Sequence, residues 1–337
     1  MVVQMGNSII DSLKKAKRRY VAQWTLSSLD KYRGHQYLDT YAGPDTDDAV
    51  AVKAQVTFYA HQIEKGLSHS DFRYGFGKKA LANLSRALDK LRSLDDGYAD
   101  NEAYLSALSA LHEYIVRHNA VGYDITDVRR LFAADVWSAA VETEGVEGGS
   151  VVVSASTKNG NGEKTFRELA HERHAIREYA DTPVTLVELS EAIDLARTAP
   201  SVCNRQAARV HVIQDADLIA KALKLQGGFN GYPMPPALLL VTADNRSFLN
   251  VYEHNEGFID GGLFGMQLLM SLEAVGLAAC PLNTVMSVET ENKARTLLHI
   301  PESEVFIMYI TVGHYPEQIR LCKFQRYALS SIMSVCE

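Results

Sequence analysis

Two clusters of polar residues, separated by one predicted helix, have the types and spacing to bind a charged organic ligand. The first cluster holds three potential cations within five residues: Arg173, His174 and Arg177. Arginine stays charged and pairs bidentately with phosphate. The second cluster presents the amide side chains of Asn204 and Gln206 just before an apolar run. Cations on one side and amides on the other suit a ligand with an anionic tail and a polar planar head, of which flavin mononucleotide (FMN) is an example.

The elements that must position these clusters are strands interspersed with helices. Apolar residues recur at helical spacing over residues 185–197, which predicts a helix. Short apolar runs at 210–213, 237–242 and 305–313, bounded by turn residues, predict buried strands. The stretch 258–277 is apolar on nearly every side and predicts a central packed helix. This order of elements indicates an α+β or α/β domain.

The first 145 residues have a different pattern, which predicts an all-helical domain. Helical spacing covers about residues 8–30, 47–65, 78–91, 101–118 and 126–141. The first helix carries a basic stretch: Lys14, Lys15, Lys17, Arg18 and Arg19. Such a helix either lies on a membrane surface or exposes a solvated charged face. Bulky apolar residues are sparse around the charges, which favours the solvated face.

An aromatic and glycine-rich loop, 72–77, follows the second of these helices. Gly66 is expected at the C′ position that ends the helix. Four polar residues lie near the loop: His61, Glu64, Lys65 and Arg73. They either line the mouth of a substrate site, or belong to a helix cap and a loop that aromatic residues hold to the core. The second interpretation is favoured.

Residues 146–164 are rich in glycine and small polar residues, a composition typical of a linker. Three successive valines, 151–153, predict a short edge strand within it. This segment therefore separates a helical domain of residues 1–145, without an assigned role, from a second domain of residues 165–337.

The overall composition narrows the classes of function. The chain has 337 residues, 47% hydrophobic and 22% charged, with a net charge of −7, which fits two globular domains and argues against a nucleic-acid partner. The four cysteines lack CxxC spacing: Cys203, Cys280, Cys322 and Cys336. A disulfide framework or a metal site is therefore not expected, and a reducing compartment is. Since no run approaches the roughly 18 apolar residues of a membrane span, we expect a cytoplasmic protein without membrane insertion.

Four segments of the second half resemble, in order, the nitroreductase family of flavoenzymes. They are Arg173-His-Ala-Ile-Arg, Ala199-Pro-Ser-Val-Cys-Asn-Arg-Gln, Asp260-Gly-Gly through Gly276-Leu-Ala-Ala-Cys-Pro-Leu, and Val312-Gly-His-Tyr-Pro-Glu. The resemblance covers about residues 165–330. It implies a mixed β-sheet flanked by helices, an α+β fold, and an obligate homodimer with FMN at its interface. It also implies NADH or NADPH as the reductant.

The resemblance also implies which residues contact the cofactor. The phosphate and ribityl contacts would come from Arg173, His174, Ala175, Arg177, Lys323 and Arg326. The contacts to the ring would come from the turn that contains Pro200, Ser201, Asn204 and Gln206. The backbone of Pro281, Leu282 and Asn283 would approach flavin N5. No catalytic side chain and no metal are implied, because the flavin carries the redox chemistry.

The chain departs from the family pattern at several positions. Ala175 stands where a serine is usual, which removes a hydroxyl donor to the phosphate. Ala207 and Ala208 replace a proline and an aromatic residue, so the family's substrate preference does not carry over. Cys203 is better interpreted as a small thiol than as a nucleophile, because no histidine partner is evident nearby.

These observations support three functions. The leading one is an FMN-dependent oxidoreductase that uses NAD(P)H to reduce a nitroaromatic- or quinone-like small molecule by ping-pong hydride transfer. A second is a flavin-dependent oxidase or dehydrogenase that acts on a biosynthetic intermediate. The third is a non-catalytic flavin-binding scaffold that docks a partner through residues 1–145.

Overall fold

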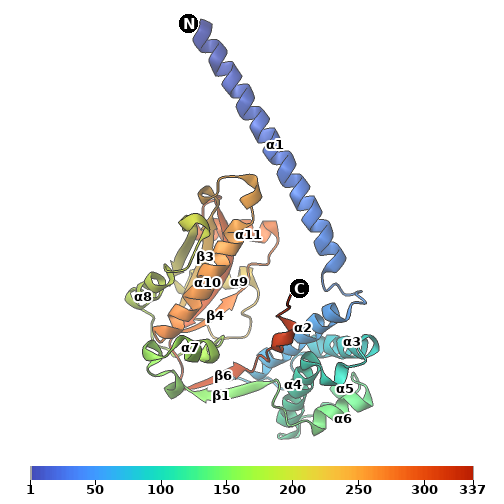
Figure 1. Cartoon of the computed structure of the whole chain (residues 1–337). Helices are drawn as coiled ribbons and strands as arrows, with labels where there is room; N and C mark the ends of the chain where they lie inside the picture. Colours follow the sequence, from blue (N-terminus) through green and yellow to red (C-terminus); the bar gives the residue numbers. More distant parts are fainter. Residues whose placement is uncertain (1, 337) are drawn as a thin grey trace.

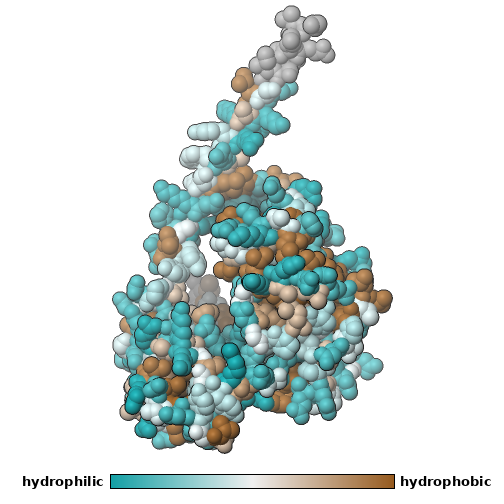
Figure 2. Space-filling model, turned by 180° about the vertical axis from the view of Figure 1, so that it is seen from behind, coloured by the Kyte–Doolittle hydropathy of each residue, from teal (hydrophilic) through white to brown (hydrophobic). Residues whose placement is uncertain are grey.

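The computed structural model describes residues 2–336 and shows a helical half followed by an α+β half (Figure 1). The helices before the first strand are α1 (Val2–Thr40), α2 (Ala49–Leu67), α3 (Lys78–Leu94), α4 (Glu102–Asn119), α5 (Thr126–Arg129) and α6 (Ala134–Glu142). Figure 2 shows both halves from behind, with the long helix α1 extending beyond them. Within residues 2–336, no helix has both the length and the apolar character needed to cross a membrane.

Helices α2, α3 and α4 pack around the core of the helical half. Their apolar stripes bury Val56, Leu84 and Leu111 completely, which is the expected result of apolar residues at helical spacing. The side chain of Asp48 caps α2 by accepting a hydrogen bond from the backbone N–H of Ala51 at 2.9 Å. These helices form a closely packed platform, because the core residues on their facing surfaces are buried.

The aromatic loop 72–77 packs onto this platform. Phe72 and Phe76 contact the helical core, and the hydroxyl of Tyr114 donates a hydrogen bond to the carbonyl of Phe76 at 3.2 Å. The expected C′ position of Gly66 is wrong, since α2 continues to Leu67. The glycine is needed for a different reason: a Cβ there would lie 1.8 Å from the Phe76 ring.

We expect Gly66→Ala to destabilise the helical half by about 1–3 kcal/mol, the usual cost of overpacking. The added methyl group would displace Phe76 and with it the loop. Urea unfolding followed by far-UV circular dichroism measures the change. Gly34→Ala is the control, because nothing lies within 4 Å of a Cβ at that exposed helical position. Equal stabilities of the two variants would contradict the prediction.

The α+β half is built on a four-stranded sheet in the order β2-β3-β5-β4. The strands are β2 (Ala208–Ile213), β3 (Ala237–Asp244), β4 (Ala278–Leu282) and β5 (Glu304–Gly313). All three pairings are antiparallel, so within one chain the sheet differs from the mixed sheet that the resemblance implies. The relative direction of two strands depends on the path of the segment that connects them. The alternation of side chains along a strand carries no information about that path. The α+β class itself is confirmed.

Helices cover both faces of this sheet. Leu239 and Val241 of β3 pack with α8 (Leu186–Ala196) and α10 (Glu256–Ala274). The alternate residues Leu238 and Leu240 pack with α9 (Ala216–Gln226) and α11 (Val288–Leu298). Strand β3 is buried along its whole length, because successive side chains point to opposite faces and both faces are covered.

The segment 146–164, for which composition predicts a linker, is ordered. Its valines form β1 (Ser150–Ser154), which pairs antiparallel with β6 (Gln318–Cys322) near the carboxyl end of the chain. Lys158 is buried and pairs with Glu273 of α10 at 2.6 Å. The Asn161 side chain donates a hydrogen bond to the Glu273 carbonyl at 2.8 Å. The segment is thus fixed to both α10 and strand β6, with which β1 forms a two-stranded ribbon. Helix α7 (Phe166–Glu172) follows it.

Candidate functional site

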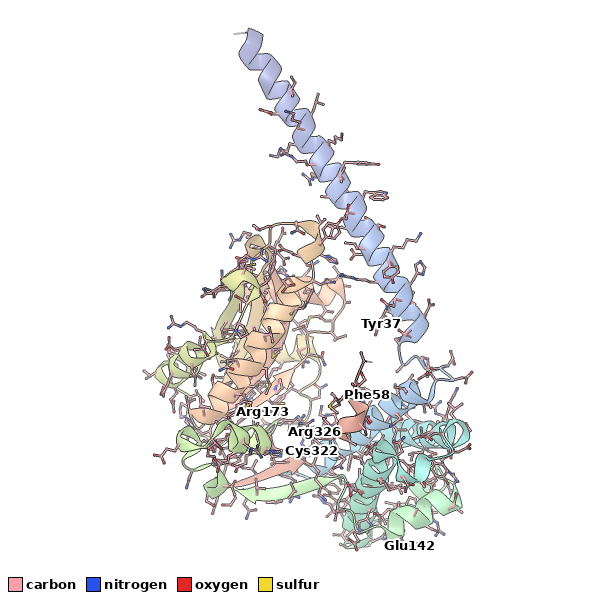
Figure 3. All side chains as sticks on the ribbon, viewed as in Figure 1. Tyr37, Phe58, Glu142, Arg173, Cys322 and Arg326 are labelled. Atoms are coloured by element: carbon pink, nitrogen blue, oxygen red, sulfur yellow. The ribbon has the colours of Figure 1, made fainter. Side chains whose placement is uncertain are left out.

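A cavity of about 300 Å³ brings together six of the residues for which a cofactor role is predicted. The chain leaves α7 at Glu172 and enters the cavity directly, while the tail after β6 supplies the opposite wall. The lining residues are Ala170, His171, Arg173, His174, Ala175, Pro281, Lys323, Phe324 and Arg326. Figure 3 shows Arg173 of the α+β half beside Arg326 of the tail and Cys322, the last residue of β6. We name this cavity the cation pocket.

The cation pocket has a donor set that suits a phosphate group. None of its lining residues is acidic, and within residues 2–336 Arg173 forms no ion pair. The ammonium group of Lys323 donates a hydrogen bond to the Gly145 carbonyl at 2.6 Å, which leaves its charge uncompensated. Cations without carboxylate partners favour a bound anion, and arginine is the side chain that best matches phosphate geometry.

His174 lines the pocket but does not act as a third cation of the Arg173 cluster. Its Nδ1 lies 2.6 Å from the carbonyl oxygen of Glu172, so this nitrogen takes the donor role. Burial lowers the pKa of His174, with smaller contributions that include Lys158 and Arg173. The ring is therefore neutral at neutral pH, and the positive charge of the pocket comes from Arg173, Lys323 and Arg326.

Arg177 does not line the cation pocket but lies next to it. Its Nη1 is 3.8 Å from the sulfur of Cys322. Its guanidinium is 5.9 Å from the ring centres of Tyr232 and Phe324, and Phe324 belongs to the pocket wall. The two arginines of the predicted cluster therefore have different surroundings.

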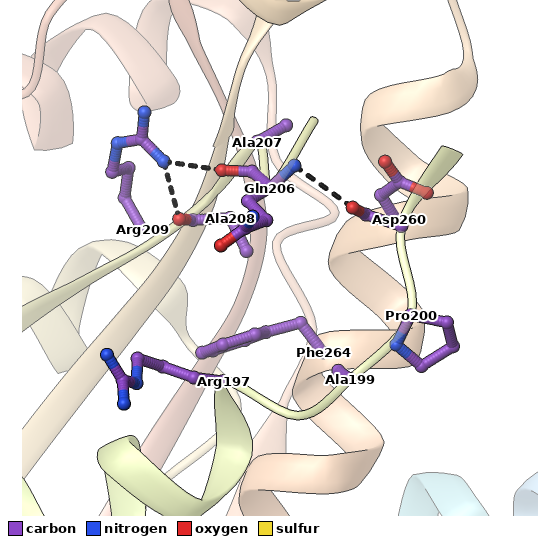
Figure 4. A pocket seen from close by; sticks show the side chains of 10 residues that line it. Arg197, Ala199, Pro200, Gln206, Ala207, Ala208, Arg209, Asp260 and Phe264 are labelled. Atoms are coloured by element: carbon purple, nitrogen blue, oxygen red, sulfur yellow. Dashed lines mark hydrogen bonds between the residues drawn. The ribbon is translucent and has the colours of Figure 1, made fainter. Parts of the chain in front are cut away.

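A second pocket of about 190 Å³ contains Pro200, Ser201 and Gln206 (Figure 4). Its other lining residues are Arg197, Ala199, Ala207, Ala208, Arg209, Asp260 and Phe264. The two pockets share no residue, so a single chain does not unite the predicted phosphate cations with the predicted ring contacts. We name this second cavity the amide pocket, after the amide group of Gln206.

The turn beside the amide pocket holds an unusual backbone. Three of its residues have positive φ angles: 49° at Cys203, 55° at Asn204 and 50° at Gln206. These values lie in the left-handed region, which residues other than glycine adopt uncommonly. Such strain persists only where the surroundings enforce it, and it often marks a binding site. Asn204 and Gln206 are both exposed and available to a ligand.

Two carboxylates that sequence reasoning missed hold this turn. The buried Asp260 of α10 accepts a hydrogen bond from the Val202 N–H at 3.0 Å. Glu253 binds the Arg205 guanidinium through two hydrogen bonds of 2.9 and 3.1 Å. The signal for Asp260 was present in the sequence, because an acidic residue within a largely apolar stretch of helix needs a partner where it is buried.

The segment predicted to approach flavin N5 continues from the cation pocket. Pro281 lines the pocket, Leu282 ends β4, and Asn283 follows. The Gln226 side chain donates a hydrogen bond to the Asn283 carbonyl at 3.1 Å. This bond fixes the backbone at the edge of the pocket.

One group in the described part of the chain has metal-binding spacing, but a protonated thiol and a neighbouring arginine disfavour a metal ion there. Ligand atoms of His61, Glu64 and Cys322 lie within 4.8 Å of one another. Burial is the main cause that raises the pKa of Cys322 to about 11, so the thiol is protonated at neutral pH. Metals bind thiolate, and the Arg177 guanidinium 3.8 Å from this sulfur adds repulsion.

Comparisons with known proteins match the α+β half. Residues 170–230 match the profile of the nitroreductase family. The FMN reductase [NAD(P)H] of Bacillus subtilis (strain 168) is 26% identical over 158 residues, which cover 42% of this chain and 63% of that protein. A protein of Archaeoglobus fulgidus, described as an NADH dehydrogenase/NAD(P)H nitroreductase, is 24% identical over 150 residues, covering 44% and 84% of the two chains.

Solved structures match the same half. A structure from Parabacteroides distasonis, described as an NADH dehydrogenase/NAD(P)H nitroreductase, is 21% identical, covers 50% of this chain and 96% of its own, and has a TM-score of 0.44. A nitroreductase structure from Bacillus subtilis is 19% identical, covers 51% and 98%, and also scores 0.44. The family profile and the two sequence relatives thus show that the α+β half is similar to proteins of the nitroreductase family.

Proposed function

We propose that this protein is an FMN-dependent oxidoreductase that uses NADH or NADPH to reduce a small-molecule acceptor. The observation that carries the proposal is the cation pocket, where Arg173, Lys323 and Arg326 converge without an acidic residue. The names of the two sequence relatives, which refer to FMN and to NAD(P)H, support the choice of cofactor and reductant. The chain spans 63% of the length of the first of them.

In this proposal each group of residues has a binding role. Arg173, Lys323 and Arg326 bind the phosphate of FMN, and the segment from Pro281 to Asn283 borders the ring. When bound, FMN supplies hydride transfer at N5, so the protein needs to orient the cofactor, exclude water and offer hydrogen-bond donors to the ring. The acceptor is nitroaromatic- or quinone-like and follows the reductant in ping-pong order. The four free cysteines support a reducing compartment such as the cytoplasm.

We further propose a homodimer in which the amide pocket of one copy completes the site of the other. The separation of the two pockets within one chain supports this arrangement. A second support is the exposed apolar face of α10, where four large side chains are each about half exposed: Phe258, Ile259, Leu263 and Met266. Apolar faces of this kind usually mark protein interfaces. A second copy of the chain would cover the face and bring Asn204 and Gln206 to the cofactor.

Mixing the purified full-length protein with FMN and then with NADH or NADPH tests the proposal. We expect stoichiometric FMN binding, rapid loss of flavin absorbance on addition of the nucleotide, and its return when a nitroaromatic or quinone is added. Sedimentation of the FMN-loaded protein should give twice the 37.3 kDa chain mass. Absence of FMN binding would refute the proposal. Binding with slow reduction and no turnover would favour the scaffold function instead.

A further inference from the structure

The last turn of α2 docks directly on the α+β half. The ammonium group of Lys65 donates a hydrogen bond to the Gly228 carbonyl at 3.0 Å. The hydroxyl of Tyr232 donates one to the Lys65 carbonyl at 3.1 Å. The His69 ring stacks on the Tyr232 ring, with 3.8 Å between their centres. The helical half is thus joined to the other half at the loop between α9 and β3.

Lys65 and Arg177 are two neighbouring cations without an acidic partner. Within residues 2–336 neither forms an ion pair, whereas the partly buried Arg205 binds Glu253 at 2.9 Å. Burial lowers the pKa of Lys65, and the positive charge of Arg177 lowers it further. Both residues adjoin Tyr232: its hydroxyl bonds to the Lys65 carbonyl, and its ring centre lies 5.9 Å from the Arg177 guanidinium. Both side chains are only partly exposed.

Within residues 2–336, the titratable groups around these two cations form no ion pair with either of them. Burial raises the pKa values of the adjacent thiols of Cys280 and Cys322, so both thiols are neutral at neutral pH. The carboxylate of Glu64 accepts a hydrogen bond from the Gly149 N–H at 3.0 Å. Glu178 accepts one from the Ser70 N–H at 2.9 Å. A half-buried pair of like charges is costly, and a bound anion would offset that cost.

The two cations adjoin the site already described. Arg177 lies 5.9 Å from the ring of Phe324, which lines the cation pocket. From Gly228, which accepts the Lys65 hydrogen bond, two further hydrogen bonds lead to Asn283, in the segment predicted to approach flavin N5. The Gly228 N–H donates to the Gln226 side chain at 2.7 Å, and this side chain donates to the Asn283 carbonyl at 3.1 Å.

We propose that Lys65 and Arg177 together bind an anionic oxygen group of the ligand held at the FMN site, so that the helical half contributes a cation to that site. This inference rests on the proposed function. Lys65 lies outside the residues that match the nitroreductase family. The anionic group has two possible sources: the oxygen-bearing edge of the flavin ring, which gains negative charge on reduction, or an acidic substituent of the acceptor.

Lys65→Met removes the charge at nearly constant length and tests the inference. If the flavin is the source, FMN binds the variant apoprotein about tenfold more weakly by fluorescence titration, equivalent to about 1.4 kcal/mol. The flavin midpoint potential then also becomes more negative. If the acceptor is the source, these two values stay unchanged, and the KM for 4-nitrobenzoate rises about tenfold while that for nitrobenzene does not. Lys65→Arg should restore either property.

Lys53→Met is the matched control, since Lys53 lies on the same helix and pairs with Glu102 at 3.9 Å. If the Lys65 variant equals this control in FMN affinity, midpoint potential and the ratio of the two KM values, the inference is wrong. Thermal melting checks that the variants fold. If Lys65→Met does not fold, Lys65→Gln, which keeps a hydrogen-bond donor, takes its place. A wild-type protein that binds no FMN overturns the proposed function together with this inference. If the wild type binds FMN but the Lys65 variant equals the Lys53 control in all three measurements, only the inference is overturned.

Discussion

Arg173→Ala is expected to weaken FMN binding about a hundredfold, so that the protein loses the cofactor during purification. Arg173 lines the cation pocket and has no carboxylate partner within residues 2–336, so its guanidinium is available to the phosphate. Hydrogen bonds between charged groups contribute about 1.5–3 kcal/mol each. Loss of a bidentate pair therefore corresponds to about 3 kcal/mol, or two orders of magnitude in Kd. Titration of the apoprotein with FMN measures the change.

Two further variants separate the role of Arg173 from a general effect of charge. Arg173→Lys keeps the charge but loses the planar guanidinium that binds phosphate through two hydrogen bonds. Its Kd for FMN should therefore lie between those of the wild type and Arg173→Ala. Arg130→Ala removes an exposed arginine of the helical half that pairs with Asp127 at 3.1 Å, and it should bind FMN like the wild type. If Arg173→Ala binds FMN as tightly as Arg130→Ala, the cation pocket is not the phosphate site.

Glu273→Gln should cause the largest loss of stability, about 3–5 kcal/mol of unfolding free energy. The Glu273 carboxylate pairs with Lys158 at 2.6 Å, and both side chains are almost completely buried. It also accepts a hydrogen bond from the hydroxyl of Tyr315 at 2.9 Å. The glutamine keeps the shape but leaves the buried Lys158 charge without an anionic partner, since its remaining bond is to the Glu172 carbonyl. Urea denaturation followed by circular dichroism measures the effect.

The double variant Lys158→Met, Glu273→Leu distinguishes charge from packing. It removes both charges and should recover much of the stability, because apolar pairs of similar volume replace buried ion pairs at little cost. Lys293→Met breaks the exposed pair with Glu289 and should cost less than about 1 kcal/mol. A Glu273→Gln variant as stable as Lys293→Met would show that the buried pair is not what fixes the segment 146–164.

Local patterns predicted most of the elements. The helical spacing around Leu84 and Leu111 and the continuous apolar run of β3 each correspond to an observed element. Helix α9 was not predicted, although its buried residues Ile219, Ala222 and Leu223 follow helical spacing. The four antiparallel strands were not foreseen either, since side-chain alternation is the same in both pairing directions.

For the candidate site, the family resemblance selected residues that the fold brings together, such as Arg173, Pro281 and Arg326. It did not foresee that the amide pocket lies apart from the cation pocket, because that depends on where α8 and α10 place the turn. Contacts such as Lys65 with Gly228 join residues 163 positions apart. No spacing rule within one segment records such a contact, and it emerges only when both halves are folded.

The ribbon of β1 and β6 makes the two halves inseparable. The tail that carries Lys323 and Arg326 begins where β6 ends, and β6 is paired with the strand that leaves the helical half. The Lys323 N–H also donates a hydrogen bond to the Gly149 carbonyl at 3.0 Å. A chain that started at residue 165 would keep the four-stranded sheet but lose the partner of β6. A chimera with a different helical domain would therefore have to retain residues 145–154, so that β6 keeps its partner strand.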